Sequence, residues 1–309
     1  MAEPEDEIKP ASEGRYRSTR GLDYESVPWR LWEKSKKLFW DPADIDFTQD
    51  AADWRTMSEE ERARVALSAR GFLVGEEAVT LDIIPLLRAM SDAGRLEDTM
   101  YLSMFAMEEG KHTEMFRRWF DAVGLDPAAL DDLIPERRGA DGERRGGIFD
   151  GPLERVMRRL DTDRSPEAML DASIIYNQFV EGVLAIAGYQ RWEQVFQTLG
   201  KLPGLEAGLE LTQRDERRHI AYGTYLARRI LAEHPELWDW LENRWAKLTA
   251  SLGGGYGSDD PEAAEVADLH QRLARRRLEA LAVARTMDVA TVDSSAIESF
   301  EPVELQHVN

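Results

Sequence analysis

Apolar residues recur with the period of an α-helix along four long stretches of the chain. The first begins after Ser58, which can form a capping box with Glu61, and Pro85 is expected to kink it, with an earlier end as the alternative. Pro166 and Pro203 each occupy the first helical position of a later stretch. The four expected helices cover about residues 58–90, 97–123, 165–199 and 203–232.

The rest of the pattern predicts an all-α fold. Two more helices are expected at about 236–252 and 261–286, and no segment alternates apolar and polar residues over the length of a strand. Residues 125–164, rich in Pro, Gly and Arg, separate the second long helix from the third. We therefore expect a four-helix bundle with one long crossover and additional peripheral helices. The expected organisation is a flexible N-terminal arm (1–25), a single folded domain (26–286) and a C-terminal tail (287–309).

Two of the long helices carry a Glu-x-x-His unit on the face that points inward. The units are Glu109 to His112 on the second helix and Glu216 to His219 on the fourth. Residues three apart lie on the same side of a helix, so each carboxylate and imidazole can bind one metal ion together. A third such unit, ending at His307, has no amphipathic helix around it and is interpreted as chance.

The other two long helices each place a glutamate in an apolar run. These are Glu181 and Glu76, and Glu76 is preferred over the adjacent Glu77 because it shares its face with apolar residues. Burying unpaired carboxylates is very costly, and a bound metal removes that cost. Four carboxylates and two imidazoles in one bundle core are the ligand set of dinuclear carboxylate sites in ferritin-like bundles.

Composition narrows the classes of partner. The 309 residues include 59 acidic and 39 basic side chains, a formal net charge of -20, which disfavours nucleic acid and anionic membranes as partners. Without cysteine, a metal can be held only by oxygen and nitrogen. No stretch is long and apolar enough for membrane insertion and no apolar leader is evident, so we expect a cytoplasmic protein.

Residues 25–285 resemble the ligand-binding oxidases related to the small subunit of ribonucleotide reductase. The resemblance rests on the six candidate ligands, on the run from Gly75 to Asp82, and on Tyr176 five residues before Glu181. In that family the matching valine and tyrosine become joined by an ether bond, which the metal site itself forms. The resemblance implies that Val79 and Tyr176 are this pair.

The resemblance further implies one manganese and one iron ion per chain. Manganese would lie nearer Glu76, Glu109 and His112, and iron nearer Glu181, Glu216 and His219. A di-iron centre stays open, because oxygen and imidazole ligands suit both metals. The implied activity is two-electron C–H oxidation with O₂. The implied partners are a long-chain fatty-acid-like ligand and a second copy of the chain in a homodimer.

Two alternatives remain open at this point. A class Ic type ribonucleotide reductase small subunit would explain Phe116, which stands where many such subunits carry a radical tyrosine. Trp40, Asp215 and His112 also look like the electron-transfer chain of those subunits, although Asp215 could equally orient the imidazole of His112. The C-terminus lacks the aromatic-bearing tail expected for docking to a catalytic subunit. A ferritin-like metal-storage protein is the other alternative.

Overall fold

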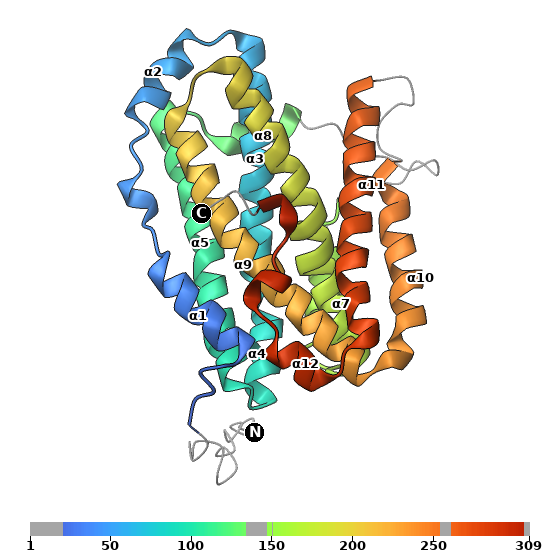
Figure 1. Ribbon diagram of the computed structural model, residues 1–309. Helices are drawn as coiled ribbons and strands as arrows, with labels where there is room; N and C mark the ends of the chain where they lie inside the picture. The colour runs from blue at the N-terminus through green and yellow to red at the C-terminus, as the bar shows by residue number, and fades with distance from the viewer. Residues whose placement is uncertain (1–20, 134–146, 150, 254–260, 306–309) are drawn as a thin grey trace, which may run out of the picture.

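The computed structural model describes residues 21–133, 147–149, 151–253 and 261–305, and within them every regular element is a helix (Figure 1). The expected N-terminal arm, the arginine-rich part of the crossover and the Glu-x-x-His unit ending at His307 lie largely outside these ranges. None of the described helices is long and apolar enough to cross a membrane. Four rods form the bundle: α3 (Glu59–Asp82), α5 (Leu96–Val123), the continuous run of α7 (Pro166–Ser173), η3 (Ile174–Ala185) and α8 (Ile186–Leu199), and α9 (Pro203–Glu233).

Shorter helices surround the bundle. In Figure 1, α1 and α2 lie along one side and the antiparallel pair α10 and α11 along the other, while α6 belongs to the crossover between α5 and α7. The remaining helices are α1 (Val27–Lys37), α2 (Thr48–Thr56), α4 (Ile84–Asp92), α6 (Pro152–Arg159), α10 (Trp238–Thr249), α11 (Pro261–Ala282) and α12 (Val289–Ser294). Short 3₁₀ segments are η1 (Pro42–Asp44), η2 (Pro127–Leu133), η4 (Pro235–Leu237), η5 (Ala250–Gly253), η6 (Val283–Thr286), η7 (Ile297–Ser299) and η8 (Val303–Leu305).

The ends of the bundle helices follow the sequence signals, with one correction. Ser58 and Glu61 form the predicted capping box at the start of α3. The helix does not continue with a kink to residue 90: as in the alternative of an earlier end, it stops at Asp82, and α4 starts at Ile84. Pro85 has no N–H to donate to the carbonyl of Leu81, and its ring crowds that carbonyl, so the hydrogen-bonded run is interrupted although Ile83 keeps a helical backbone conformation.

The last described stretch packs against the bundle, although the sequence shows little pattern there. Residues 287–305 form α12, η7 and η8, and α12 contacts α9. Val292 and Phe300 are buried in the same apolar cluster as the bundle core. Glu301 accepts hydrogen bonds from Lys34 on α1 and Arg217 on α9. Buried apolar residues and the Glu301 carboxylate therefore fix this segment against the bundle.

A buried carboxylate holds the start of α9 against α2. Asp50 accepts hydrogen bonds from the backbone N–H groups of Gly204 and Leu205, at 2.7 and 2.8 Å. Its second oxygen also accepts from the indole of Trp119 on α5 at 3.1 Å. An acidic side chain satisfies free N–H groups at a helix N-terminus and complements the positive end of the helix dipole. Asp50 thus fixes α9 relative to α2 and α5.

The apolar core is divided in two by a polar layer. Along α5, Phe105 belongs to one buried cluster and Met115 to the other, and along α9 the same holds for Ile220 and Leu209. The glutamates and histidines of the predicted site lie between these positions. The fold therefore encloses the polar residues with apolar packing at both ends.

Candidate metal centre

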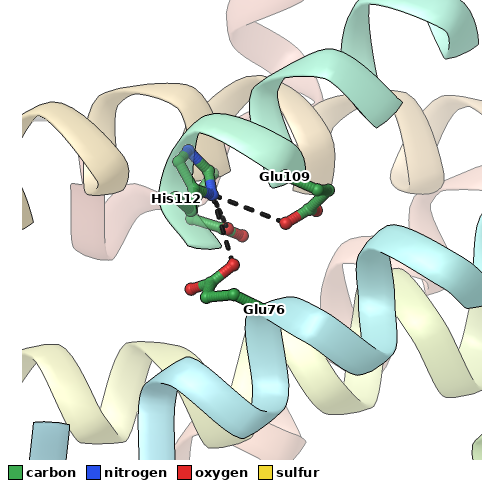
Figure 2. A group of neighbouring side chains, drawn as sticks. Glu76, Glu109 and His112 are labelled. Atoms are coloured by element: carbon green, nitrogen blue, oxygen red, sulfur yellow. Dashed lines mark hydrogen bonds and ion pairs between the residues drawn. The ribbon is translucent and has the colours of Figure 1, made fainter. Parts of the chain in front are cut away.

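The structure brings all six predicted ligand residues into one buried cluster. On one side, Nδ1 of His112 lies 3.3 Å from Oε2 of Glu76, 3.4 Å from Oε2 of Glu109 and 3.5 Å from Oε1 of Glu216. Figure 2 shows Glu76 of α3 facing Glu109 and His112 of α5. These four residues offer ligand atoms that all lie within 4.8 Å of one another.

The other side of the cluster forms around His219. Its Nδ1 lies 3.3 Å from Oε1 of Glu109, 3.8 Å from Oε1 of Glu216 and 4.0 Å from Oε1 of Glu181. Glu109, Glu181 and His219 make a second group with ligand atoms within 4.8 Å. Glu109 belongs to both groups, and one oxygen of Glu216 lies between the two imidazoles. The geometry therefore suits two ions with carboxylates shared between them.

The choice between the two adjacent glutamates of α3 is settled by burial. Glu76 is 6% exposed and points into the cluster, whereas Glu77 lies on the exposed face of the helix. Successive residues of an α-helix point about 100° apart, so only one of the pair can face the core.

A π-helix positions the ligand residue of the third rod. The segment η3 covers Ile174–Ala185, where the sequence predicts an ordinary α-helix. Its hydrogen bonds run from residue i to i+5, so Tyr176 and Glu181 lie on the same face one turn apart. In an α-helix, five residues would place them about 140° apart. The unusual helix therefore aligns the tyrosine with the glutamate.

Residues of the π-helix also hold this side of the site in place. Asn177 donates to Oε2 of Glu181 at 2.9 Å, which leaves Oε1 free to face the cluster. Gly223 of α9 permits this, because a Cβ there would lie 2.1 Å from the Cβ of Asn177. The hydroxyl of Tyr176 donates to the backbone carbonyl of Val79 at 3.0 Å and lies 3.4 Å from Oε1 of Glu109. The structure thus places Val79 and Tyr176 together beside the cluster.

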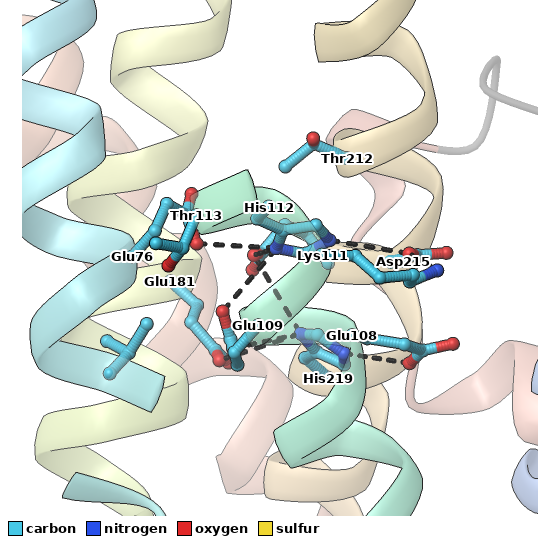
Figure 3. A network of polar contacts seen from close by, with 12 residues as sticks. Glu76, Glu108, Glu109, Lys111, His112, Thr113, Glu181, Thr212, Asp215 and His219 are labelled. Atoms are coloured by element: carbon cyan, nitrogen blue, oxygen red, sulfur yellow. Dashed lines mark hydrogen bonds and ion pairs between the residues drawn. The ribbon is translucent and has the colours of Figure 1, made fainter. Parts of the chain in front are cut away.

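Each imidazole contacts a carboxylate from the opposite helix on its outer side (Figure 3). Nε2 of His112 lies 3.3 Å from Oδ2 of Asp215. This distance is expected if Asp215 orients the imidazole of His112. Nε2 of His219 lies 2.9 Å from Oε2 of Glu108, a residue that sequence reasoning missed. The sequence does contain a signal for Glu108, because an acidic residue directly precedes the glutamate in both Glu-x-x-His units.

Cations complete this outer arrangement. Lys111 donates to Asp215 at 3.0 Å, and the guanidinium of Arg218 donates to Glu108 at 2.6 Å and also to Asp215. Both cations directly precede a site histidine in the sequence, so the two units share one pattern: acid, glutamate, any residue, base, histidine. A carboxylate on the outer nitrogen of a ligand imidazole fixes its orientation and tautomer. Helices α5 and α9 therefore position each other's histidines.

Burial and charge crowding shift the proton affinities of the cluster. Burial raises the pKa of Glu76 to about 8, and it raises the pKa of Glu181 and Glu216 as well. Burial also opposes ionisation of Glu109, but the neighbouring imidazoles outweigh it and lower its pKa to about 2. Although burial disfavours the cations, the surrounding carboxylates raise the pKa of both histidines. Protons therefore balance part of the negative charge.

Unpaired buried atoms indicate that cations fit this cluster. Oε2 of Glu109, Oε1 of Glu181, Oε2 of Glu216 and Nδ1 of His219 have no hydrogen-bond partner among the described residues. A buried polar atom without a partner costs about 1–3 kcal/mol, and these atoms lie in one place. The oxygen and imidazole donors suit first-row divalent metals such as manganese and iron. The residues present therefore fit a dinuclear metal site.

Trp40 lies on the outer side of His112, beside Asp215. Its indole N–H donates to Oδ2 of Asp215 at 2.8 Å, and its ring stacks on the imidazole with 6.2 Å between centroids. Lys111 lies 4.5 Å from the centre of the Trp40 ring. The predicted trio of Trp40, Asp215 and His112 is thus in contact, while Phe116 is buried beside Phe72.

Comparison with known proteins identifies the family. Residues 22–250 match the family described as ribonucleotide reductase, small chain. The R2-like ligand-binding oxidase from Sulfolobus acidocaldarius, solved by 3D micro-crystal electron diffraction, is 35% identical, with 90% of this chain and 97% of that chain covered and a TM-score of 0.78.

Two further structures add information on the metals. An R2-like ligand-binding oxidase with aerobically reconstituted Mn/Fe cofactor is 34% identical, with 93% of this chain and 94% of that chain covered and a TM-score of 0.68. A variant of such an oxidase with anaerobically reconstituted Mn/Fe cofactor is 34% identical, with 85% and 94% covered and a TM-score of 0.72. The predicted ferritin-like fold and the family resemblance are confirmed. This chain, with its buried cluster able to hold two metal ions, belongs to the ribonucleotide reductase small-chain family, where its relatives are the R2-like ligand-binding oxidases.

Proposed function

We propose that this protein is an oxidase that uses O₂ at a manganese and iron centre for two-electron oxidation of C–H bonds. The observation that carries the proposal is the buried cluster of four carboxylates and two imidazoles with unpaired atoms facing one another. The Mn/Fe cofactor of the relatives supports the choice of metals. The residues that would hold the ions are Glu76, Glu109, His112, Glu181, Glu216 and His219.

When bound, the two ions would supply electrons for the reduction of O₂ and the oxidising power to remove hydrogen from carbon. The chain contributes the rest of the chemistry. Apolar packing on both sides of the layer limits access of water. Glu109 and Glu216, which each lie near both imidazoles, would help to hold both ions. Asp215 and Glu108 keep the imidazoles oriented throughout.

The same centre would join Val79 and Tyr176. The O–H bond of Tyr176 and the Cβ–H bond of Val79 break and one C–O bond forms, so two protons and two electrons leave the chain and the electrons pass to O₂. The contact of the phenol oxygen with the Val79 carbonyl supports this pairing, since the Cβ belongs to the same residue. Both side chains are buried, so water has little access to the reacting bonds.

We also propose a long-chain fatty-acid-like ligand, in line with the ligand binding that gives the relatives their name. A carboxylate head would find cations at the metal site, and a hydrocarbon tail would meet the apolar side chains that border the polar layer. Homodimer formation, a cytoplasmic location and the lack of nucleic-acid binding stay predictions from the sequence.

Mass spectrometry with metal analysis tests the proposal. Protein reconstituted with manganese and iron and exposed to air should contain two metals per chain and a loss of two hydrogens that links the Val79 and Tyr176 peptides. Tyr176→Phe should keep both metals and lose the link, because the phenol oxygen is the joining atom. Tyr189→Phe, which removes another buried hydroxyl, should keep it. A wild-type chain with both metals and no link would contradict the crosslink, and two iron ions would identify a di-iron centre.

The contacts of Trp40 favour one alternative, a class Ic type ribonucleotide reductase small subunit. Trp40, Asp215 and His112 form a connected path away from the cluster, as an electron-transfer chain requires. Support of nucleotide reduction by an added catalytic subunit would favour that function over the oxidase. The metal-storage alternative would instead require uptake of many ions per chain.

A further inference from the structure

A line of aromatic rings leads away from the candidate metal centre on the side opposite Trp40. It starts at His219, whose ring stacks on Phe105 with 3.6 Å between centroids and 10° between planes. Phe105 lies 6.2 Å from Tyr101, and Tyr101 lies 5.1 Å from Tyr222. Tyr222 lies 6.3 Å from Tyr225. Every step is a contact between neighbouring rings, and electron transfer between rings at contact distance is fast.

The line follows the seam between two helices that also carry the metal ligands. His219, Tyr222 and Tyr225 are spaced three residues apart on α9, so they follow one another along one side of the helix. Tyr101 and Phe105 are four apart on α5, which packs against α9. The rings therefore connect the buried cluster with the end of the seam near α12.

Two of the three tyrosines have an acceptor for the phenolic proton. Tyr222 donates to Oδ1 of Asp98 at 3.0 Å, and Tyr225 donates to Oδ1 of Asp293 at 3.0 Å. The hydroxyl of Tyr101 is buried with no partner among the described residues. A phenol becomes a very strong acid when it loses an electron, so a stable oxidised tyrosine needs a nearby base. Tyr222 and Tyr225 meet that condition, and Tyr101 serves only as a bridge.

The far end of the line approaches solvent. Tyr225 is itself buried, but the side chain of its acceptor Asp293 is 40% exposed and also pairs with Arg229. Arg95, which holds Asp98 through two hydrogen bonds, lies 3.4 Å from the Tyr225 hydroxyl. A proton released at Asp293 can therefore reach water. A soluble reductant can likewise approach the Asp293 side chain, next to Tyr225.

We propose that Tyr222 and Tyr225 form a one-electron relay that supplies electrons to the oxidised metal centre when no organic substrate is present. The proposal rests on the proposed function, because the metal centre is the oxidant. Tyr222 gives one electron to the centre through Tyr101 and Phe105, and its phenolic proton passes to Asp98. Tyr225 then gives one electron to Tyr222, which recovers its proton from Asp98, while the Tyr225 proton passes to Asp293.

The relay is reset from outside. A soluble one-electron reductant, such as a thiol, gives an electron to Tyr225, and a proton returns through Asp293. Each cycle removes one oxidising equivalent from the buried centre. The relay would thus protect the surrounding core, including Phe105 and the ligand side chains, from oxidation.

Flash photo-oxidation of the metal-free full chain tests the relay without depending on the metal chemistry. The starting variant replaces Tyr16, Tyr24 and Tyr256 by Phe, so that these tyrosines do not contribute to the signal. A soluble ruthenium photo-oxidant should generate a tyrosyl radical. Absorption and electron paramagnetic resonance spectroscopy detect this radical. Adding Tyr225→Phe should abolish the fast formation of the radical at Tyr222. Adding Tyr222→Phe should leave the radical on Tyr225 with a changed hyperfine pattern and decay.

Both changes keep the ring and remove one oxygen atom, so packing is preserved. Tyr189→Phe in the same starting variant is the matched control, because that buried hydroxyl lies outside the line, and it should change neither signal. Identical signals in the parent, the Tyr222→Phe and the Tyr225→Phe variants would overturn the relay.

Exposure of the reduced, metal-loaded protein to O₂ provides the second test. Freeze-quenched wild-type samples should show a transient tyrosyl radical that is lost in Tyr222→Phe, at unchanged metal content. Consumption of O₂ without a radical at Tyr222 or Tyr225 would overturn the relay. If O₂ is not consumed, the proposed function fails, and the photo-oxidation result still decides whether electrons move along the tyrosines.

Discussion

At the scale of single residues, the candidate site combines the proposed ligands with side chains that orient them. A glutamate and a histidine three residues apart can bind a metal only if the imidazole keeps its direction. Asp215 and Glu108 provide this from opposite helices, and Lys111 and Arg218 neutralise them. The two Glu-x-x-His units therefore depend on each other, and neither half would be fully oriented alone.

Replacement of Glu108 tests this dependence. Glu108→Gln keeps the shape of the side chain but removes the charge that faces His219 and Arg218. We expect metal affinity to fall by about 10- to 100-fold, the usual effect of changing a group that orients a metal ligand. Competition with a chelator measures the affinity. Glu114→Gln on the same helix, an exposed partner of Arg118, should leave it unchanged, and equal affinities in both variants would refute the role of Glu108.

At the scale of elements, the site depends on helix ends and irregular helical turns, which fix the positions of the four bundle helices relative to one another. Asp50 of α2 caps α9, Pro85 ends α3 after the site, and the π-helix η3 turns Tyr176 and Glu181 to the same face. Of these features, only the π-helix contains one of the candidate metal ligands, Glu181. They fix the register at which four helices present their carboxylates.

The Asp50 cap makes a prediction about stability. Asp50→Ala removes the acceptor of two backbone N–H groups and of the Trp119 indole, so unfolding should cost about 1–2 kcal/mol less. Asp50→Asn keeps one carbonyl oxygen as an acceptor, so its free energy of unfolding should fall by less than that of Asp50→Ala. Denaturant unfolding of the metal-free chain measures both, and a midpoint for Asp50→Ala equal to that of the wild type would exclude a stabilising cap.

At the scale of the whole molecule, the apolar core surrounds a highly charged layer. Since burial raises the pKa of Glu76 to about 8, the folded chain favours its protonated form. Folding with this group ionised is unfavourable above its ordinary pKa of 4.5, and the cost grows until the pH reaches about 8. Metal ions replace protons at such sites and remove this cost.

The stabilisation by metals should therefore depend on pH. We expect the difference in Tm between metal-loaded and metal-free protein to increase as the pH rises from about 5 to about 8, because the metal-free chain loses its balancing protons over that range. Thermal unfolding at several pH values, with and without a chelator, measures the difference. A difference that stays constant or shrinks over this range would contradict the assignment of Glu76 as a buried, protonated ligand.

Much of the fold and the site follows from sequence periodicity. Inward-facing positions recur at helical spacing, and an acidic residue among them is unfavourable unless a ligand compensates it. That reasoning, together with the two Glu-x-x-His units, predicts Glu76, Glu109, Glu181 and Glu216 with His112 and His219 as the ligand set. The family resemblance adds Val79 and Tyr176, which no periodic pattern distinguishes from ordinary core residues.

Tertiary structure decided the features that depend on contacts between distant segments. Glu108 appears from sequence alone as one more acidic residue on α5, and only the approach of α9 brings its carboxylate to His219. The π-helix also escapes a pattern search, because the apolar period of residues 174–185 is that of an ordinary helix, and the close contact between Asn177 and Gly223 of α9 is visible only in the fold. Similarly, residues 287–305 show no strong period, since single anchors such as Phe300 and Glu301 fix them. The sequence determined which groups enter the core, because burial selects residue types locally, and packing alone decided which of those groups meet.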